Sequence, residues 1–230
     1  MSTTSARLLG ALGSALLMAV SAPTRAQGLE LSVGGRVTVP VTSLKDIKFQ
    51  RTLRQQYDYS CGAAALATLL SHHYHTPTPE RDVFQQMYAS GDKTKIHKEG
   101  FSLLDMQRYL ASRGFRADGF KLPLEKLIAE KLPAIVLITD RGFNHFVVIK
   151  GAEDGRVLIG DPSTGNRVVS MERFQDIWRN KILFVIHSHK EQVAFNTPQD
   201  WRGAPRAPLG AGMHQDQLSA TLPKFGPGDF

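Results

Sequence analysis

The sequence predicts an α+β fold in which helices come first and an antiparallel sheet follows. Apolar residues recur at helical spacing between residues 61 and 132. From residue 134 onward, short β-branched runs are separated by turn motifs such as Asp140-Arg141-Gly142 and Glu153-Asp154-Gly155. Because only short turns join these runs, the strands are expected to pair as an antiparallel sheet.

Residues 1–26 have the features of a secretory signal peptide. Arg7 precedes the apolar run Leu8–Ala22, and Thr24-Arg25-Ala26 offers small residues at both positions of a cleavage site. The run is short for a transmembrane helix, although an uncleaved membrane anchor remains the alternative. The chain is therefore predicted to be periplasmic, with membrane contact only through an uncleaved signal segment.

The charge of the chain does not indicate a nucleic-acid partner. Its formal net charge of +7 falls to about +5 when the two arginines of residues 1–26 are removed. The remaining Lys and Arg residues are scattered, without a basic run or interleaved aromatics. The sequence also shows no convincing set of metal ligands and no nucleotide-binding glycine loop, so no cofactor and no metal are predicted.

Residues 27–53 are interpreted as an N-terminal extension with a β-hairpin. The apolar residues of Glu30–Val41 alternate with polar ones around Gly34-Gly35, which is a common two-residue hairpin turn. The same dipeptide is also typical of a double-glycine protease target. Self-processing at this position therefore remains an alternative reading.

Residues 54–190 are predicted to form one domain. Capping residues such as Thr78 and Ser102, and breakers such as Gly114 and Pro133, mark the ends of its helices. Helices are expected at residues 61–74, 79–87, 103–110, 124–132 and 171–178, with a charged loop at residues 91–100.

Strands are expected at residues 115–120, 134–139, 145–150, 157–160, 167–170 and 182–186. The run at 134–139 is apolar throughout, which predicts a strand buried on both faces. The last stretch, residues 191–230, is rich in Pro and Gly and is predicted to be an extended or disordered tail. Packing of this stretch as a terminal arm, through residues such as Trp201, is the alternative.

Cys61 is the one cysteine of the chain, and it lies where a polar loop turns into an apolar helix. The free N–H groups and the dipole at a helix start favour the thiolate. An unpaired thiol is a liability in an oxidising compartment, which favours a functional cysteine over a buried inert one. Gly62 is expected to leave room for a substrate chain, and Gln55 to donate its amide to an oxyanion beside the sulfur.

A thiol protease also needs a histidine and a group that orients it. His145 opens one predicted strand and Asp161 ends the next, so an antiparallel pairing brings their side chains together. Asn144 is a second candidate partner for the histidine. Taken singly, His145 is also typical of a hydrogen-bonded strand residue and Asp161 of an ordinary turn.

Three motifs resemble the C39 peptidase family, which processes bacteriocins. They are Gln55-x5-Cys61-Gly62-Ala63-Ala64, Asn144-His145-Phe146-Val147-Val148 and Gly160-Asp161-Pro162, and the resemblance covers residues 54 to 186. It implies a papain-like fold, in which a helix carrying the cysteine packs on an antiparallel sheet carrying the histidine and the aspartate. It also implies a cysteine peptidase with Cys61 as nucleophile, His145 as general base and acid, Asp161 as orienting residue and Gln55 as oxyanion donor.

Many members of that family are cytoplasmic domains of ABC exporters that cut leader peptides after Gly-Gly. This chain is expected to lie on the other side of the membrane, and its stretch from Arg54 to Ala65 is similar to stand-alone exported members that accompany functional-amyloid (Fap) fimbria export. We expect an exported cysteine endopeptidase that processes a co-exported polypeptide, with secretion-system components as further partners. A non-catalytic C39-like substrate-binding module and a papain-like acyl transferase or amidase are the alternatives.

Overall fold

A computed structural model describes residues 29–32, 36–39 and 42–204 of the chain. They fall into two compact units, which divide between Thr42 and Ser43. In the first unit, strands β1 (Leu29–Ser32) and β2 (Arg36–Val39) pair antiparallel, as their alternating sequence predicts. The predicted signal peptide and the Gly34-Gly35 turn lie outside the described residues.

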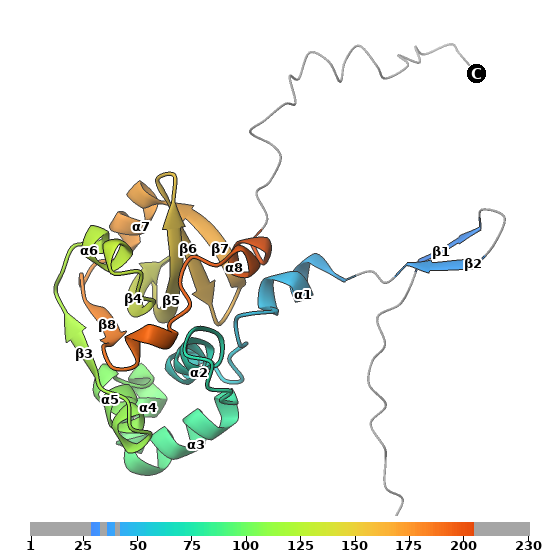
Figure 1. The fold of residues 1–230 in the computed structure, drawn as a ribbon. Coiled ribbons are helices and arrows are strands. Elements are labelled where there is room, and N and C mark those ends of the chain that lie inside the picture. The colour runs from blue at the N-terminus through green and yellow to red at the C-terminus, as the bar shows by residue number, and fades with distance from the viewer. Residues whose placement is uncertain (1–28, 33–35, 40–41, 205–230) are drawn as a thin grey trace, which may run out of the picture. The chain divides into compact units, whose positions relative to one another are not determined.

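The second unit is built around a six-stranded antiparallel sheet with the order β3-β8-β4-β5-β6-β7 (Figure 1). Its strands are β3 (Ala117–Phe120), β4 (Ala134–Asp140), β5 (Phe143–Glu153), β6 (Arg156–Asp161), β7 (Gly165–Ser170) and β8 (Leu183–Ile186). Four consecutive strands, β4 to β7, form a meander joined by short turns. The predicted antiparallel sheet is therefore confirmed.

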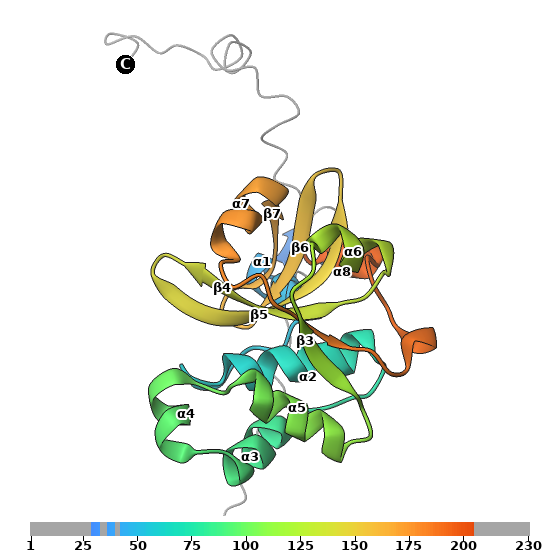
Figure 2. The same ribbon diagram turned by 90° about the vertical axis from the view of Figure 1, so that its left-hand side faces the viewer.

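Helices cover both faces of this sheet (Figure 2). Helices α2 (Cys61–His73), α3 (Glu80–Ser90), α4 (Lys93–Glu99) and α5 (Leu103–Ser112) gather on one side of the sheet, and α6 (Leu124–Ala129) and α7 (Met171–Ile177) lie on the other. The strands are apolar on both faces for this reason: Val148 packs in the core beneath α2, whereas Val147 and Ile149 pack with α6 and α7.

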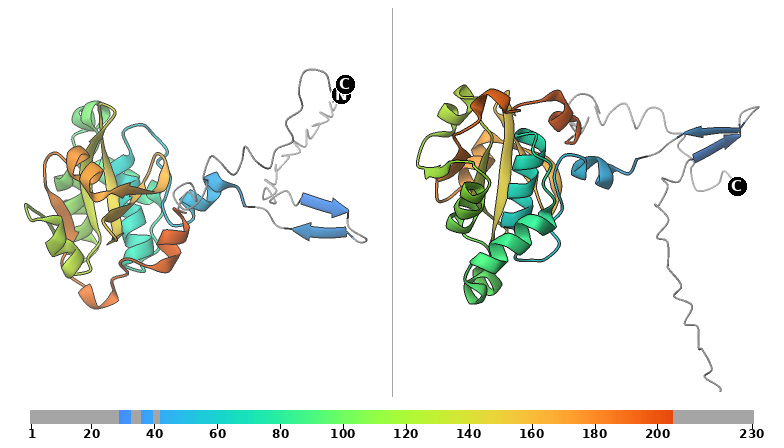
Figure 3. Two further views of the ribbon diagram at one scale, coloured as in Figure 1. Left: turned by 90° about the horizontal axis from the view of Figure 1, so that it is seen from above. Right: turned by 60° about the horizontal axis from the view of Figure 1, so that its bottom comes forward.

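Helix α2 is buried along almost its whole length, because it lies between the sheet and α3 (Figure 3). Four alanines, at positions 63, 64, 65 and 67, are fully buried in it. Small side chains let the backbones of neighbouring elements approach closely, so the cysteine at the start of α2 is held in a rigid setting.

Helices α4 and α1 (Leu44–Phe49) lie in segments where the sequence analysis expected no helix. The segment read as a charged loop, residues 91–100, contains α4, because the Asp92 carboxylate caps its first turn and Ile96 anchors it in the core. Helix α1 begins after Ser43, whose hydroxyl accepts from the Asp46 N–H. In both segments the apolar signal is too short to show helical periodicity.

The packed chain continues past residue 190, where the sequence analysis placed the end of the domain. A short 3₁₀ helix (Lys190–Gln192) is followed by helix α8 (Pro198–Arg202). Asp200 in α8 is fully buried and forms ion pairs with Lys150 at 2.7 Å and Arg51 at 2.8 Å. Its charged partners lie far away in the sequence, so composition alone did not reveal this attachment. Within the described part of the chain, no helix has the length and apolarity to cross a membrane.

Candidate active site

Cys61 is the first residue of α2. Ser60, the residue before the helix, makes no side-chain cap. Its hydroxyl instead accepts from the Tyr57 N–H and donates to the Tyr57 carbonyl, both at 3.1 Å. The side chain of Ser60 therefore closes the loop before the cysteine. The N–H groups of the first turn stay free to face the sulfur.

His145 and Asp161 meet as the sequence analysis expected. The Nε2 atom of His145 lies 3.0 Å from Oδ2 of Asp161. The other carboxylate oxygen accepts from the backbone N–H groups of Ser163 at 2.8 Å and Thr164 at 3.3 Å, in the turn between β6 and β7. Because Nε2 is engaged, Nδ1 is the ring nitrogen of His145 that remains for proton exchange. The amide oxygen of Asn144 accepts from the Thr139 hydroxyl at 2.6 Å instead of serving the histidine.

The electrostatics of Asp161 suit a residue that orients an imidazole. Its side chain is almost completely buried, with 2% of its surface exposed. Burial by itself would raise the pKa of Asp161, but the His145 ring, the Ser163 N–H and the Arg167 guanidinium outweigh it and lower the pKa to about 2. The carboxylate is therefore ionised at neutral pH.

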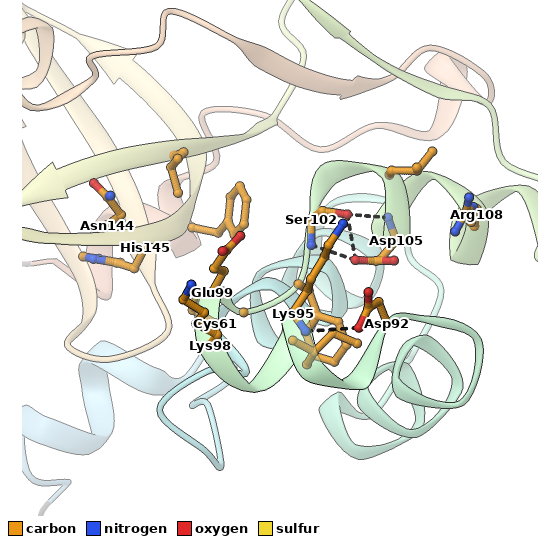
Figure 4. Close-up of a pocket in the computed structure, with 16 residues that line it drawn as sticks. Cys61, Asp92, Lys95, Lys98, Glu99, Ser102, Asp105, Arg108, Asn144 and His145 are labelled. Carbon is orange, nitrogen blue, oxygen red and sulfur yellow. Dashed lines mark hydrogen bonds between the residues drawn. The ribbon is translucent and has the colours of Figure 1, made fainter.

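Cys61, Asn144 and His145 line one end of a cleft of about 780 Å³ (Figure 4). The far wall comes from α4 and the start of α5. It carries charged side chains that the sequence analysis did not single out: Asp92, Lys95, Lys98, Glu99, Asp105 and Arg108. A cleft of this size can bury part of a ligand next to the thiol.

The surroundings of Cys61 oppose its ionisation in this arrangement. Burial raises the pKa of the thiol, and the charge of Asp161 acts in the same direction. The backbone N–H groups of Phe146 and Gly62 act against this increase, but do not cancel it. Burial therefore outweighs the helix start, which the sequence analysis expected to favour the thiolate, and the pKa of the thiol lies above its usual value. A base such as His145 assists the removal of a proton from such a thiol.

Gln55 lies between the loop before Cys61 and the turn after Asp161, and it is not among the residues that line the cleft. Its backbone N–H donates to the carbonyl of Pro162 at 3.1 Å, and its side-chain oxygen accepts from Ser163 at 3.0 Å. The amide nitrogen donates to the carbonyls of Tyr57 at 3.0 Å and Asp58 at 3.4 Å. In this arrangement the side chain of Gln55 joins the cysteine loop to the Asp161 turn, and its role as an oxyanion donor requires it to turn.

Gly62 serves packing and not substrate access, contrary to our expectation. A Cβ atom at this position would lie 2.7 Å from Cε of Met106 and 3.2 Å from Cβ of Phe101. Both neighbours are buried core residues. The glycine therefore lets α5 and the segment before it pack against the first turn of α2.

Residues 50–190 match the Peptidase C39 family. The chain belongs to the peptidase C39 family. It is 40% identical over 174 residues to a Pseudomonas fluorescens protein named probable functional amyloid protease FapD, which covers 74% of this chain and 76% of the relative. A protein of the same name from Pseudomonas aeruginosa has the same identity and coverage.

The fold agrees with this membership. The peptidase domain of Streptococcus ComA, a bifunctional ABC transporter, aligns with a TM-score of 0.50 at 22% identity, over 59% of this chain and 96% of that domain. This C39 chain is a cysteine peptidase with a papain-like fold, as the sequence predicts. Among the described residues, no group of three or more His, Cys, Asp or Glu side chains is arranged to hold a metal ion.

Proposed function

We propose that this chain is an exported cysteine endopeptidase that uses Cys61, His145 and Asp161 to cleave a secreted or exported polypeptide. The observation that carries the proposal is the 3.0 Å pair between His145 and Asp161, because His145 lines the same cleft as Cys61, the only cysteine of the chain. A buried ionised carboxylate, an oriented imidazole and a thiol at a helix start are the three parts that a thiol protease requires.

In the proposed reaction, Sγ of Cys61 attacks the carbonyl carbon of the scissile peptide bond, and Nδ1 of His145 takes the thiol proton. The tetrahedral intermediate collapses when the imidazolium returns that proton to the leaving amine, which breaks the C–N bond and leaves a thioester on Cys61. Water then attacks the thioester with His145 again as base, which releases the new carboxylate and restores the thiol. Asp161 stays ionised and holds the imidazole in place.

The oxyanion of the tetrahedral intermediate needs donors beside the sulfur. The backbone N–H of Cys61 is at the free N-terminus of α2 and supplies the first. Gln55 supplies the second when its amide turns from the carbonyls of Tyr57 and Asp58 toward the cleft.

Two further observations support the proposed location and the proposed class of substrate. The signal-peptide pattern of residues 1–26 supports export to the periplasm. The 40% identity to proteins named functional amyloid protease supports a substrate that is itself an exported, amyloid-forming polypeptide or a component of its secretion system.

The test uses the purified full chain and the polypeptides that are exported with it, with products identified by mass spectrometry. The wild-type chain is expected to release fragments with free carboxylates, and Cys61→Ala to release none. His145→Ala is expected to lower the cleavage rate by at least about 10³-fold. His187→Ala is a matched control, because His187 also pairs with an aspartate, Asp118 at 2.7 Å, but does not line the cleft.

Three results would point elsewhere. Cleavage that persists in Cys61→Ala would overturn the assignment of the nucleophile. If an added amine acceptor becomes joined to the substrate, the enzyme is an acyl transferase. If the polypeptide binds the wild-type chain but is never cut, the chain is a binding module.

A further inference from the structure

Arg167 on β7 lies against the carboxylate that orients His145, and neither the sequence motifs nor the proposed reaction gives it a role. Its Nε atom is 3.4 Å from Oδ2 of Asp161, the same oxygen that holds Nε2 of His145 at 3.0 Å. Its Nη2 atom is 3.2 Å from Oδ2 of Asp140. The guanidinium therefore bridges Asp161 to a second carboxylate on β4.

The sheet explains why these residues meet. Arg167 pairs with Ile159 in the β6–β7 ladder, and Asp161 lies two residues beyond Ile159 on the same face. Diagonal neighbours of this kind are within reach of a long side chain. The Nε atom of Arg167 is buried and has no hydrogen-bond partner among the described residues, so its 3.4 Å approach to Asp161 is a contact between opposite charges and not a hydrogen bond.

We propose that Arg167 is a positioning residue of the active site, which compensates part of the charge of Asp161 and thereby favours the thiolate form of Cys61. This inference rests on the proposed function of Cys61, His145 and Asp161. The Asp161 carboxylate opposes ionisation of the thiol, and a cation bound to that carboxylate reduces the opposition. Asp140 holds the guanidinium in place through its contact with Nη2.

Other charged groups surround the site and stay unchanged in the test. Arg173 on α7 binds Asp140 at 2.9 Å but has no contact with Asp161. The cleft wall that faces Cys61 carries Asp92, Lys95, Lys98, Glu99, Asp105 and Arg108.

The experiment compares Arg167→Gln with Arg173→Gln, which removes the same charge from the same Asp140 and serves as matched control. The pH dependence of Cys61 alkylation by iodoacetamide and of peptide cleavage is measured at low ionic strength, where screening is weak. In Arg167→Gln the alkylation midpoint is expected to move up by about half a pH unit to one unit. Below the midpoint, alkylation is then about three- to tenfold slower.

In Arg167→Gln, both the acidic and the basic limb of the pH–rate profile of peptide cleavage are expected to move to higher pH. Loss of the cation disfavours the thiolate of Cys61 and favours the imidazolium of His145. Arg167→Lys keeps the charge and is expected to restore the wild-type profile. If Arg167→Gln does not fold, Arg167→Met, which keeps an apolar stem, replaces it in the same measurement.

Unchanged limbs in Arg167→Gln, or an equal shift in Arg173→Gln, would overturn the inference. A lower rate with the same limbs would mean that Arg167 is merely structural. Alkylation needs no substrate, so a wild-type chain that cuts nothing would count against the proposed function while the alkylation midpoints still decide the role of Arg167.

Discussion

The buried ion pair between Lys150 and Asp200 is expected to dominate the attachment of the C-terminal segment. Both side chains are completely buried, and Nζ of Lys150 lies 2.7 Å from Oδ1 of Asp200. Asp200→Asn keeps the shape of the side chain but leaves the Lys150 ammonium without its counter-ion. Loss of one partner of a buried pair costs about 3–5 kcal/mol of the free energy of unfolding.

The structure places this variant near the lower end of that range. The Lys150 ammonium keeps two oxygen acceptors, the carbonyl of Arg51 at 2.6 Å and Oδ1 of Asn166 at 3.1 Å. We therefore expect a loss of about 3 kcal/mol at neutral pH. The total free energy of unfolding of a small domain is only about 5–15 kcal/mol, so a change of this size is readily measured.

The loss of stability caused by Asp200→Asn should also depend on pH. Burial lowers the pKa of Lys150 to about 8, and the charge of Asp200 limits this decrease. Without the carboxylate, Lys150 in the folded protein loses its proton at lower pH than in wild type. The unfolded variant, in which Lys150 keeps its proton, then binds more protons than the folded variant, so the free energy of unfolding of the variant rises with pH. Its difference in stability from the wild type should shrink between about pH 7 and pH 9.

The assay is urea unfolding followed by tryptophan fluorescence. Asp118→Asn is the control, because Asp118 pairs with His187 at a similar distance of 2.7 Å but is half exposed, and its loss should cost less than about 1 kcal/mol. The double variant Asp200→Asn/Lys150→Met should recover part of the loss, since no completely buried charge is left unpaired; Arg51, which also loses Asp200, is partly exposed. A cost for Asp200→Asn no larger than for Asp118→Asn would refute the reasoning.

Two further predictions concern His73 and Gln55. His73 is fully buried and burial lowers its pKa to about 3, so the folded protein resists its protonation. The free energy of unfolding should therefore fall as the pH drops from about 6.5 toward 3, and His73→Gln should flatten this dependence in urea titrations at a series of pH values. Gln55→Ala should lower kcat by about 10²-fold if the amide turns to the oxyanion during turnover. A drop below about threefold in kcat would leave the backbone N–H of Cys61 as the main donor.

Much of the fold could be predicted because its signals are local. The apolar run at 134–139 and the turn motifs that follow it predict a meander, and the meander brings His145 beside Asp161. Helix α4 was missed, and the packing of the α8 segment was given only as an alternative, for opposite reasons. The apolar signal of α4 is too short to show a period, and α8 is held by partners that lie far away in the chain.

Arg167 shows what sequence reasoning could still have found. Strand alternation places it on the same sheet face as Asp161, one strand further on, so the period of two is a usable signal once the meander is assumed. The raised pKa of Cys61 had no such signal. Burial comes from the whole packed structure, and it outweighed the favourable position at a helix start.

The sequence by itself determined the α+β class, the order of the motifs and the membership in the peptidase C39 family, because periodicity, turn residues and motif spacing are properties of neighbouring residues. Only the tertiary structure decided which carboxylates bind Arg167 and Lys150, where the Gln55 amide points, and that burial raises the pKa of the Cys61 thiol. These properties depend on distance and burial between residues that are remote in the chain, and small electrostatic differences at such contacts set the charge state of the site.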